Sequence, residues 1–275
     1  MIWIAIAVPA LAAELALMLL LLAAARKRRR LAAALKTAAA AEVAAPLPAV
    51  LRQLVSQAGV SHGGVAQGEA GTGGGIVRLT QHCALRFDPG GAWHDMEAQT
   101  LVATASPGFV QQAKLKAGPL AVLRTADAFV AGRGSLEARL FGLVPIAKAE
   151  GPAADRSEAI RCLAELLRAP DALAQVPGLS WQEIDAAAVR VTVATASGST
   201  EALLRVAEDG SVILRAERPR ATGAGAVPTP WEAQLRNRRP IGGRQILTES
   251  ELRWLLPGGA FPYWRGRIAG YRLEP

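Results

Sequence analysis

IVRLTQHCALRFDPGGAWHDMEAQTLVATASPGFVQQAKLKAGPLAVLRTADAFV, residues 76–130, is the stretch that decides the fold. Apolar and polar residues alternate through it with a period of two, and turn residues interrupt it at intervals of roughly ten positions. Asp88-Pro89-Gly90-Gly91 and Ser106-Pro107-Gly108 are two of these turns. Short alternating runs joined by tight turns are typical of a meandering antiparallel sheet.

The same pattern continues on both sides of one interruption. The sequence predicts strands at 76–87, 92–103, 109–116, 121–130 and 136–143, and again at 181–184, 188–195, 201–206, 212–218, 233–237, 245–254 and 264–273. An antiparallel sheet of about a dozen strands must curl or close. We therefore expect an α+β, mostly β fold built on one large curved antiparallel sheet, a half-barrel.

The interruption has the pattern of a helix over 155–168. Asp155 is placed to cap this helix, and Glu158 stands at the capping-box position. A second amphipathic helix is expected at 49–58. Both helices are predicted to lie against the concave face of the sheet and to leave an apolar groove there. A curved sheet of this kind can hold an apolar ligand.

The N-terminal segment has the composition of a membrane anchor. Residues 1–25 are apolar apart from Glu14 and are long enough to span a bilayer as a helix. No positively charged segment precedes them, so we expect an uncleaved signal anchor. Glu14 is either a functional intramembrane carboxylate or a protonated side chain. Residues 26–45 are then a basic juxtamembrane segment and helical stalk, and residues 46–275 a single β-rich domain.

The basic run Arg26-Lys27-Arg28-Arg29-Arg30 bears on both the partner and the orientation. It holds five of the chain's 31 basic residues, against 23 acidic ones, so most of the formal charge of +8 lies at the anchor. A nucleic acid is therefore not expected as a partner. By the positive-inside rule, these cations place the large domain in the cytoplasm. A domain outside the cytoplasm is the alternative.

Five short motifs are specific as a set. They are Gly132-Arg133-Gly134-Ser135-Leu136, Leu143-Val144-Pro145, Val227-Pro228-Thr229-Pro230-Trp231-Glu232, Gly242-Gly243-Arg244-Gln245-Ile246 and Phe261-Pro262-Tyr263-Trp264-Arg265-Gly266. Over residues 46–273 they resemble a bacterial family of membrane-anchored proteins of unknown function. The resemblance implies a single-pass protein of the bacterial inner (plasma) membrane and brings no activity with it.

More distantly, the succession of strands and the mid-chain helix look like the half-barrel of the Lol-type lipoprotein carriers and their mycobacterial lipid-carrying cousins. Those relatives hold acyl chains against a curved sheet outside the cytoplasm. The resemblance implies a lipid ligand and favours a periplasmic or extracellular domain, in conflict with the orientation that the charges favour.

The candidate ligand-binding residues are aromatic and charged. They are Glu165, Trp231, Glu232, Tyr263, Trp264 and Arg265. Because Pro228 and Pro230 hold the approach to Trp231-Glu232 rigid, the Glu232 carboxylate is expected to be partly desolvated, with a raised pKa. In the alternative interpretation, the tryptophans plug one end of the sheet and Glu232 pairs with an arginine.

No metal or cofactor motif is present. His82 and Cys83 are neighbours on a predicted strand and point to opposite faces, so they do not converge on a metal. Cys162 is expected to pack on the mid-chain helix, without the basic partner that a nucleophile needs. The sequence therefore gives more support to a non-enzymatic protein than to an enzyme.

The leading hypothesis is a membrane-tethered domain that binds an acyl chain or other apolar molecule in a deep apolar cavity. Two alternatives stay open. An enzyme of unknown class would use Glu232 with Arg265 or Glu165 at a carboxylate-centred cleft. A membrane-tethered interaction module would have an exposed apolar patch and no pocket.

Overall fold

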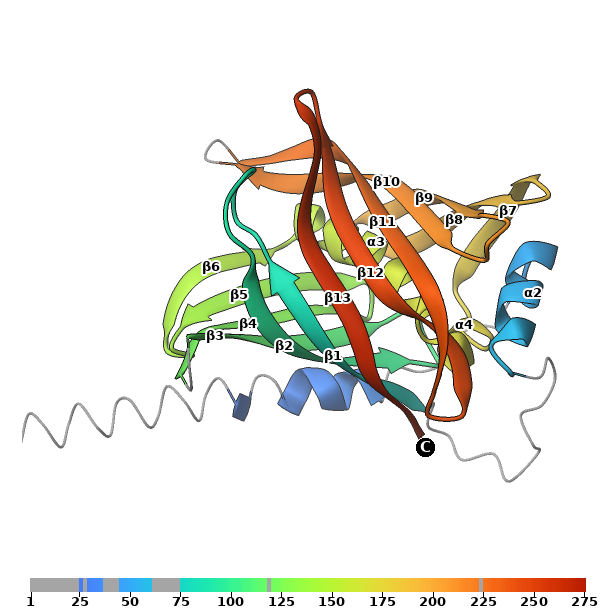
Figure 1. Cartoon of the computed structure of the whole chain (residues 1–275), viewed down its shortest axis with the longest axis horizontal. Coiled ribbons are helices and arrows are strands. Elements are labelled where there is room, and N and C mark those ends of the chain that lie inside the picture. Colours follow the sequence, from blue (N-terminus) through green and yellow to red (C-terminus); the bar gives the residue numbers. More distant parts are fainter. Residues whose placement is uncertain (1–24, 27–28, 37–44, 61–74, 118–119, 223–224) are drawn as a thin grey trace, which may run out of the picture.

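A single antiparallel sheet of thirteen strands dominates the computed structural model, which describes residues 25–26, 29–36, 45–60, 75–117, 120–222 and 225–275 (Figure 1). The strands are β1 (Ile76–Leu85), β2 (His94–Ala103), β3 (Phe109–Ala117), β4 (Leu120–Val130), β5 (Arg133–Leu140), β6 (Val144–Glu150), β7 (Leu179–Asp185), β8 (Ala188–Thr195), β9 (Gly198–Val206), β10 (Val212–Thr222), β11 (Gly225–Ile241), β12 (Arg244–Leu256) and β13 (Gly259–Glu274). The predicted mostly β, curved antiparallel sheet is confirmed.

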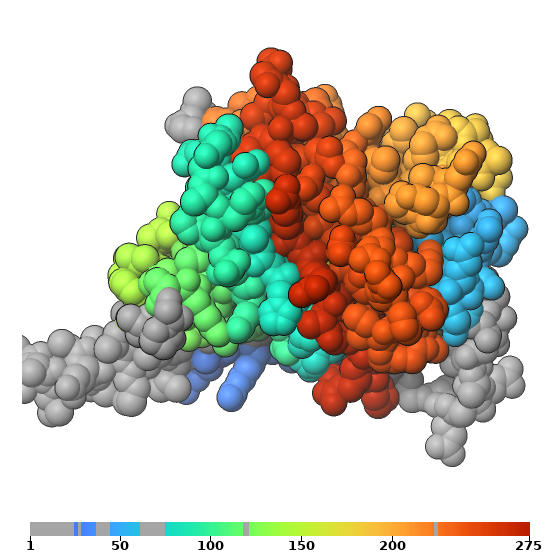
Figure 2. Space-filling model, in the orientation of Figure 1, coloured from blue at the N-terminus to red at the C-terminus, as the bar shows by residue number. Residues whose placement is uncertain are grey.

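Two meanders make up this sheet. Strands β1 to β6 pair in sequence order, strands β7 to β13 do the same, and β1 pairs with β13 to join the two halves. The two halves lie side by side on the face seen in Figure 2. Because each strand twists relative to its neighbour, so many strands in one sheet curl into a half-barrel.

The curl brings two distant turns into contact. The amide N–H of Ala196, between β8 and β9, donates to the carbonyl oxygen of Gly132, between β4 and β5, at 2.8 Å. Gly132 has a φ of +74°, and a Cβ there would lie 2.9 Å from the Ala196 nitrogen. Only glycine accommodates both the left-handed conformation and the close approach.

Helix α3 (Pro152–Leu167) lies in the concavity, as the sequence predicts, and packs against strands of both halves. Its start differs from the prediction. The helix begins at Pro152, which suits a first helical turn, so Asp155 lies inside it and is not the cap. The Asp155 carboxylate instead accepts the amide N–H of Gly134 at 2.8 Å, which ties the helix to β5.

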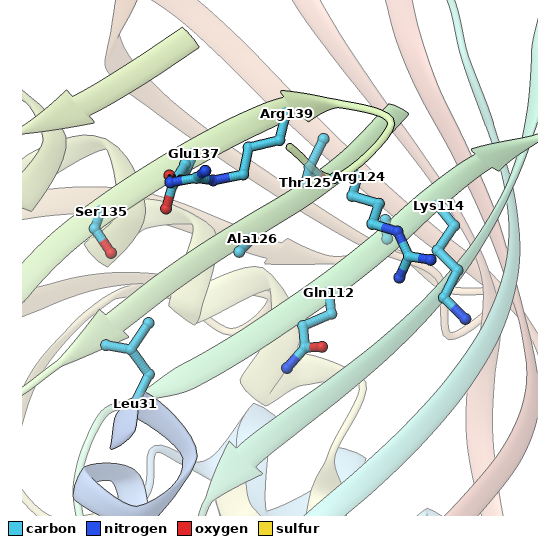
Figure 3. Close-up of a pocket in the computed structure, with 11 residues that line it drawn as sticks. Leu31, Gln112, Lys114, Arg124, Thr125, Ala126, Ser135, Glu137 and Arg139 are labelled. Carbon is cyan, nitrogen blue, oxygen red and sulfur yellow. Dashed lines mark hydrogen bonds and ion pairs between the residues drawn. The ribbon is translucent and has the colours of Figure 1, made fainter. Parts of the chain in front are cut away.

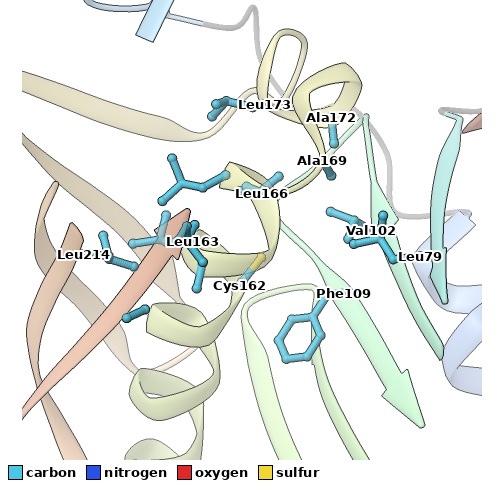
Figure 4. Close-up of a cluster of buried hydrophobic side chains, with 14 of the residues drawn as sticks. Leu79, Val102, Phe109, Cys162, Leu163, Leu166, Ala169, Ala172, Leu173 and Leu214 are labelled. Carbon is cyan, nitrogen blue, oxygen red and sulfur yellow. The ribbon is translucent and has the colours of Figure 1, made fainter. Parts of the chain in front are cut away.

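The interior beneath α3 is densely packed. Figure 4 shows Cys162, Leu163 and Leu166 of the helix between Phe109 on one side and Leu214 on the other. Two voids beside the C-terminal half of α3 and α4 (Pro170–Leu173) measure only about 10 Å³ each. The deep apolar cavity expected under the sheet is therefore filled by side chains of the described chain.

Helix α2 (Ala49–Gln57) lies at one end of the half-barrel and not alongside α3 (Figure 1). Its apolar residues Leu51, Leu54 and Val55 are buried in the main core, near α4 and the start of β12. The carbonyl oxygen of Ala58, just after the helix, accepts the amide N–H of Gln245 at 3.1 Å. This helix closes one end of the half-barrel, so any opening lies elsewhere.

Two strand segments differ from the sequence-based expectation. The predicted strand 136–143 ends at Leu140, and a separate edge strand, β6, follows the turn. The prolines at 228 and 230 lie inside β11, in the part of that strand that pairs with β10 but not with β12. Proline is tolerated there because its missing N–H faces no partner strand.

The chain before the domain is described only in part. Helical residues 29–36 pack on the convex face of the sheet, where Leu35 is buried against Ile76, Leu101 and Val110. The predicted membrane anchor, with Glu14, lies outside the described residues. Among the helices that the structure describes, none is both long and apolar enough to cross a bilayer.

Candidate functional site

A cleft of about 550 Å³ opens on the concave side of the half-barrel, between the N-terminal half of α3 and the surrounding strands. Its lining comes from β4, β5 and β6 on one side and from β10, β12 and β13 on the other, with β1 and β2 at its edge. Residues far apart in the sequence therefore meet here.

Aromatic side chains form one wall of the cleft. Trp254 of β12 stacks on Tyr263 of β13, with ring centroids 5.7 Å apart and an interplanar angle of 23°. Phe261 and Trp264 continue this wall. Tyr263 and Trp264 are consecutive, yet both line the cleft because the β12–β13 register shifts between Leu252 and Arg253. Such a bulge turns a side chain from one face of a sheet to the other.

A buried arginine, Arg218 of β10, forms the centre of the floor. Its guanidinium donates to the Glu158 carboxylate at 3.1 Å and to the Tyr263 hydroxyl at 2.9 Å. It also lies 5.4 Å from the ring centroid of Trp231 and 5.8 Å from that of Trp254. The same side chain thus holds the acid and orients the aromatic wall.

A second buried ion pair lies beside the first. Arg161 of α3 donates to Asp127 of β4 at 3.3 Å, and its guanidinium also donates to Gln111. Further along the helix, Glu165 accepts from both Arg161 and Arg168. Buried charges are costly unless they are paired, and this chain of contacts pairs them.

The two carboxyls at the cleft keep one oxygen each without a hydrogen bond among the described residues. These atoms are Asp127 Oδ1 and Glu158 Oε2. Burial raises the pKa of Asp127 and that of Glu158, against the lowering effect of the neighbouring arginines. Both oxygens are buried, and a raised pKa favours proton uptake by the carboxyls.

The structure divides the six candidate residues among three places. Tyr263 and Trp264 line the cleft, and Trp231 lies directly beneath it, where its indole N–H donates to the Tyr263 hydroxyl at 3.0 Å. Glu165 is buried deeper along α3. Glu232 and Arg265 point to the convex face.

The contacts of Glu232 and Arg265 account for their position. Glu232 alternates with the inward-facing Trp231 and bonds to Arg215 at 2.6 Å, as in the alternative interpretation of its role. Arg265 donates to Glu251 at 2.9 Å. Neither residue lines the cleft.

Sequence reasoning missed Arg218, Trp254, Asp127 and Arg161 as site residues. Glu158 was interpreted as a helix-capping residue because its spacing from Asp155 fits a capping box. A weak signal was available for Arg218. It gives β10 a positive charge at a position where the expected mid-chain helix carries the negative Glu158, and these two elements must pack together. Nothing in the sequence places these elements at one cleft, because the pairing of β1 with β13 brings them there.

The described residues contain no group of three or more His, Cys, Asp or Glu side chains that could hold a metal ion. Both cysteines are buried. Burial raises the pKa of the Cys83 thiol to about 12, and that of Cys162 well above its ordinary value. Neither thiol is therefore suited to nucleophilic attack.

A smaller depression, of about 50 Å³, lies on the convex face of β3, β4 and β5 (Figure 3). Leu31 of the N-terminal helical residues borders it, together with the cationic side chains of Lys114, Arg124 and Arg139. Its volume holds little more than one or two water molecules. It is therefore not the ligand site.

Some solved structures are similar to this chain. One is a LolA superfamily protein from Nitrosomonas europaea, 10% identical with a TM-score of 0.39, and the match covers 83% of this chain and 95% of that one. Another, from Vibrio parahaemolyticus, is a domain named for outer membrane lipoprotein sorting, 10% identical with a TM-score of 0.35, covering 72% and 85% of the two chains. No curated protein matches the sequence.

The family comparison gives a direct result. A model described as a family of unknown function, DUF6544, matches residues 41–266, which include α2, the whole half-barrel up to β13 and the cleft. The resemblance of the sequence motifs to a family of unknown function is thereby confirmed. The chain belongs to the family of unknown function DUF6544.

Proposed function

We propose that this chain is a membrane-tethered binding protein whose cleft takes the apolar part of an amphiphilic ligand, such as an acyl chain. In this proposal residues 1–25 are the anchor, residues 26–45 connect it, and residues 46–275 are the binding domain. The observation that carries the proposal is the cleft itself, which combines an aromatic wall with a buried, charged floor.

The size and lining of the cleft fit a small organic ligand. Sites for such ligands measure roughly 300–1,000 Å³ and are mostly apolar with a few placed polar groups. Here the apolar groups are Trp254, Tyr263 and Trp264, and the polar groups are the paired Glu158 and Arg218. An amphiphile would place its chain along the aromatic wall and its polar group at the floor.

The site residues in this proposal are those that border the cleft. Trp231, Tyr263 and Trp264, named from the sequence, are joined by Trp254, Glu158 and Arg218. Glu165 supports the floor through Arg161. Glu232 and Arg265 would instead stabilise the convex face of the sheet through Arg215 and Glu251.

The side of the membrane on which the domain works stays a proposal with two forms. The basic run after the apolar segment favours the cytoplasm. The Lol-type resemblance favours the periplasm or the extracellular side. A reporter fused to the C-terminus distinguishes the two, since its activity depends on the compartment.

Ligand affinity should depend steeply on chain length. With residues 26–275, which retain the buried Leu35, we expect the dissociation constant of straight-chain fatty acids to fall about tenfold for every two added carbons. Each buried methylene contributes about 0.8 kcal/mol. The quenching of tryptophan fluorescence by chains of 8 to 14 carbons measures this. Affinity that is independent of chain length would refute the proposal.

A second prediction separates the cleft from the convex face. Glu232→Gln should leave fatty-acid affinity within about twofold of the wild type, because Glu232 bonds to Arg215 and Arg253 away from the cleft. The unfolding free energy should fall by about 1.5–3 kcal/mol, the usual loss for a hydrogen bond to a charged group. Titration and urea denaturation measure the two quantities, and a tenfold loss of affinity would return Glu232 to the ligand site.

Catalysis at the cleft is the second candidate function. It is favoured by the two carboxyls, Asp127 and Glu158, whose pKa values are raised by burial beside a space that a substrate could occupy. Mass spectrometry of the ligand recovered after incubation separates the two functions. A binding protein returns the ligand unchanged, whereas an enzyme converts it.

A further inference from the structure

Four large apolar side chains are exposed together at the turn between β5 and β6. They are Leu140, Phe141, Val144 and Ile146, which we call the tip, and their exposed fractions are 38%, 54%, 55% and 57%. All four lie in the seven-residue segment 140–146, which leads into the edge strand β6. They therefore form one patch at a corner of the sheet. An exposed apolar patch of this kind marks an interaction surface.

The conformation of Phe141 sets the tip apart. Its φ is +52° and that of the next residue, Gly142, is +77°, so both central residues of the turn are left-handed. Such turns favour Asn-Gly, and a bulky aromatic residue there is unfavourable. Because the Phe141 side chain is largely exposed, packing within the described chain does little to offset that cost.

An apolar strip connects the tip to the cleft. Leu140 pairs with Val144, Ala138 with Ala147, and Leu136 with Ala149, in order from the turn inward. Directly paired residues of an antiparallel sheet share a face, and a register shift at Ile146 keeps these pairs on the same face. Leu136, Ala147 and Ala149 line the cleft.

The N-terminal helical residues lie with their basic end toward the tip. Leu35 packs near Gly108, at the β2–β3 turn, whereas Leu31 borders the depression whose far end includes Gly142 of the tip's turn. Leu31 itself packs in the cluster that includes Val130, at the end of β4 away from the tip, so the N-terminal end of this helix points along β3, β4 and β5 in the direction of the tip. Exposed Arg26, Arg29 and Arg30 precede Leu31 on the side of the tip.

Cationic side chains of β3, β4 and β5 lie beside the same corner, on the convex face of the sheet. Arg124 packs against Gly142, and Lys114 and Arg139 line the depression beside it. The apolar tip thus has a basic border on the convex face. Apolar side chains beside clustered cations match an anionic lipid surface, where the chains enter the acyl boundary and the cations meet the headgroups.

We propose that the tip docks on an anionic lipid bilayer, the one that the apolar residues preceding Arg26 would enter. This contact is separate from the anchor. It orients the domain so that the apolar strip leads from the bilayer to the cleft. The docking goes beyond the proposed function because it needs no ligand. Only the role of the strip, as the path of a chain into the cleft, rests on that function.

The depth of the tip in the bilayer tests docking directly. The full chain is reconstituted into vesicles with one quarter phosphatidylglycerol and carries a nitroxide at Phe141→Cys or, as a control, at Ile184→Cys. Ile184 is also apolar, is 46% exposed and belongs to the opposite edge strand, β7. The native Cys83 and Cys162 are buried, and labelling of the unsubstituted chain measures their background.

The measured quantity is the ratio of the label's accessibility to oxygen over its accessibility to a water-soluble nickel complex. We expect this ratio to be at least about fivefold higher at position 141 than at position 184. Equal ratios at the two positions would overturn the proposal. Spin–spin broadening between position-141 labels, together with an accessibility ratio equal to that of the control, would also overturn the proposal. It would show that the tip contacts a second copy of the chain.

A substitution that suits the turn separates docking from ligand binding. Phe141→Asn creates the Asn-Gly pair that this turn prefers, so the fold should be retained. We expect entry of a fluorescent fatty acid from vesicles into the cleft of the full chain to slow at least about threefold. The fatty-acid affinity of the full chain in detergent should be unchanged. An unchanged rate would remove the strip's role, and a loss of affinity would assign Phe141 to the ligand site.

Discussion

Replacing Arg218 by methionine should lower the free energy of unfolding by about 3–5 kcal/mol. The guanidinium is buried, donates to Glu158, Ser157 and Tyr263, and lies 5.4 Å and 5.8 Å from the ring centroids of Trp231 and Trp254. Its removal leaves the Glu158 carboxylate buried without its cation, which is the costly way to break a buried ion pair. Urea denaturation of the wild type and the variant, monitored by tryptophan fluorescence, measures the loss.

Two further variants identify the cause. Arg215→Met, three residues earlier on β10, removes an arginine whose side chain is 60% exposed on the convex face and leaves its partner Glu232 paired with Arg253, so it should cost less, about 1.5 kcal/mol. The double variant Arg218→Met/Glu158→Leu should recover at least half of the loss, because no unpaired charge remains. Equal losses for Arg218→Met and Arg215→Met, or no recovery in the double variant, would contradict the assignment of Arg218 to the floor.

Most strands of the sheet could be predicted from the sequence, because a strand with one buried and one exposed face shows that environment in its own alternation of apolar and polar residues. The period of two over residues 76–130 predicted β1 to β4, with starts at Ile76 and Phe109 that match the structure. Alternation fails where the environment is unusual. Strand β6 has every residue exposed along its length, so no inward-outward pattern marked it.

The floor of the cleft was not predictable in the same way. Asp155 and Glu158 satisfy a local rule for helix starts, yet their partners are Gly134 and Arg218, which tertiary folding brings to them. The bulge before Trp264 likewise arises from pairing with β12, and without it simple alternation would place Tyr263 and Trp264 on opposite faces. The sequence therefore indicated three of the aromatic residues of the site, while its charged residues required the structure.

Filling the cleft should abolish most ligand binding without harming the fold. Ala149 is exposed on β6 and lines the cleft opposite the aromatic wall, so Ala149→Trp would occupy the space of an acyl chain. If the indole displaces about three methylenes of a bound chain, affinity falls by about 2.4 kcal/mol, or roughly 60-fold. Stability should change by no more than about 0.5 kcal/mol, as is usual for exposed positions.

The matched control is Ala194→Trp, an exposed alanine on β8 that does not line the cleft. It adds the same side chain to the same kind of strand, so it should leave the dissociation constant of a 12-carbon fatty acid within about twofold of the wild-type value. Competition against a fluorescent fatty acid measures both variants. Because both add an indole to a strand surface, only the position of Ala149 in the cleft can separate them. Equal affinity in the two variants would mean that the chain binds outside the cleft.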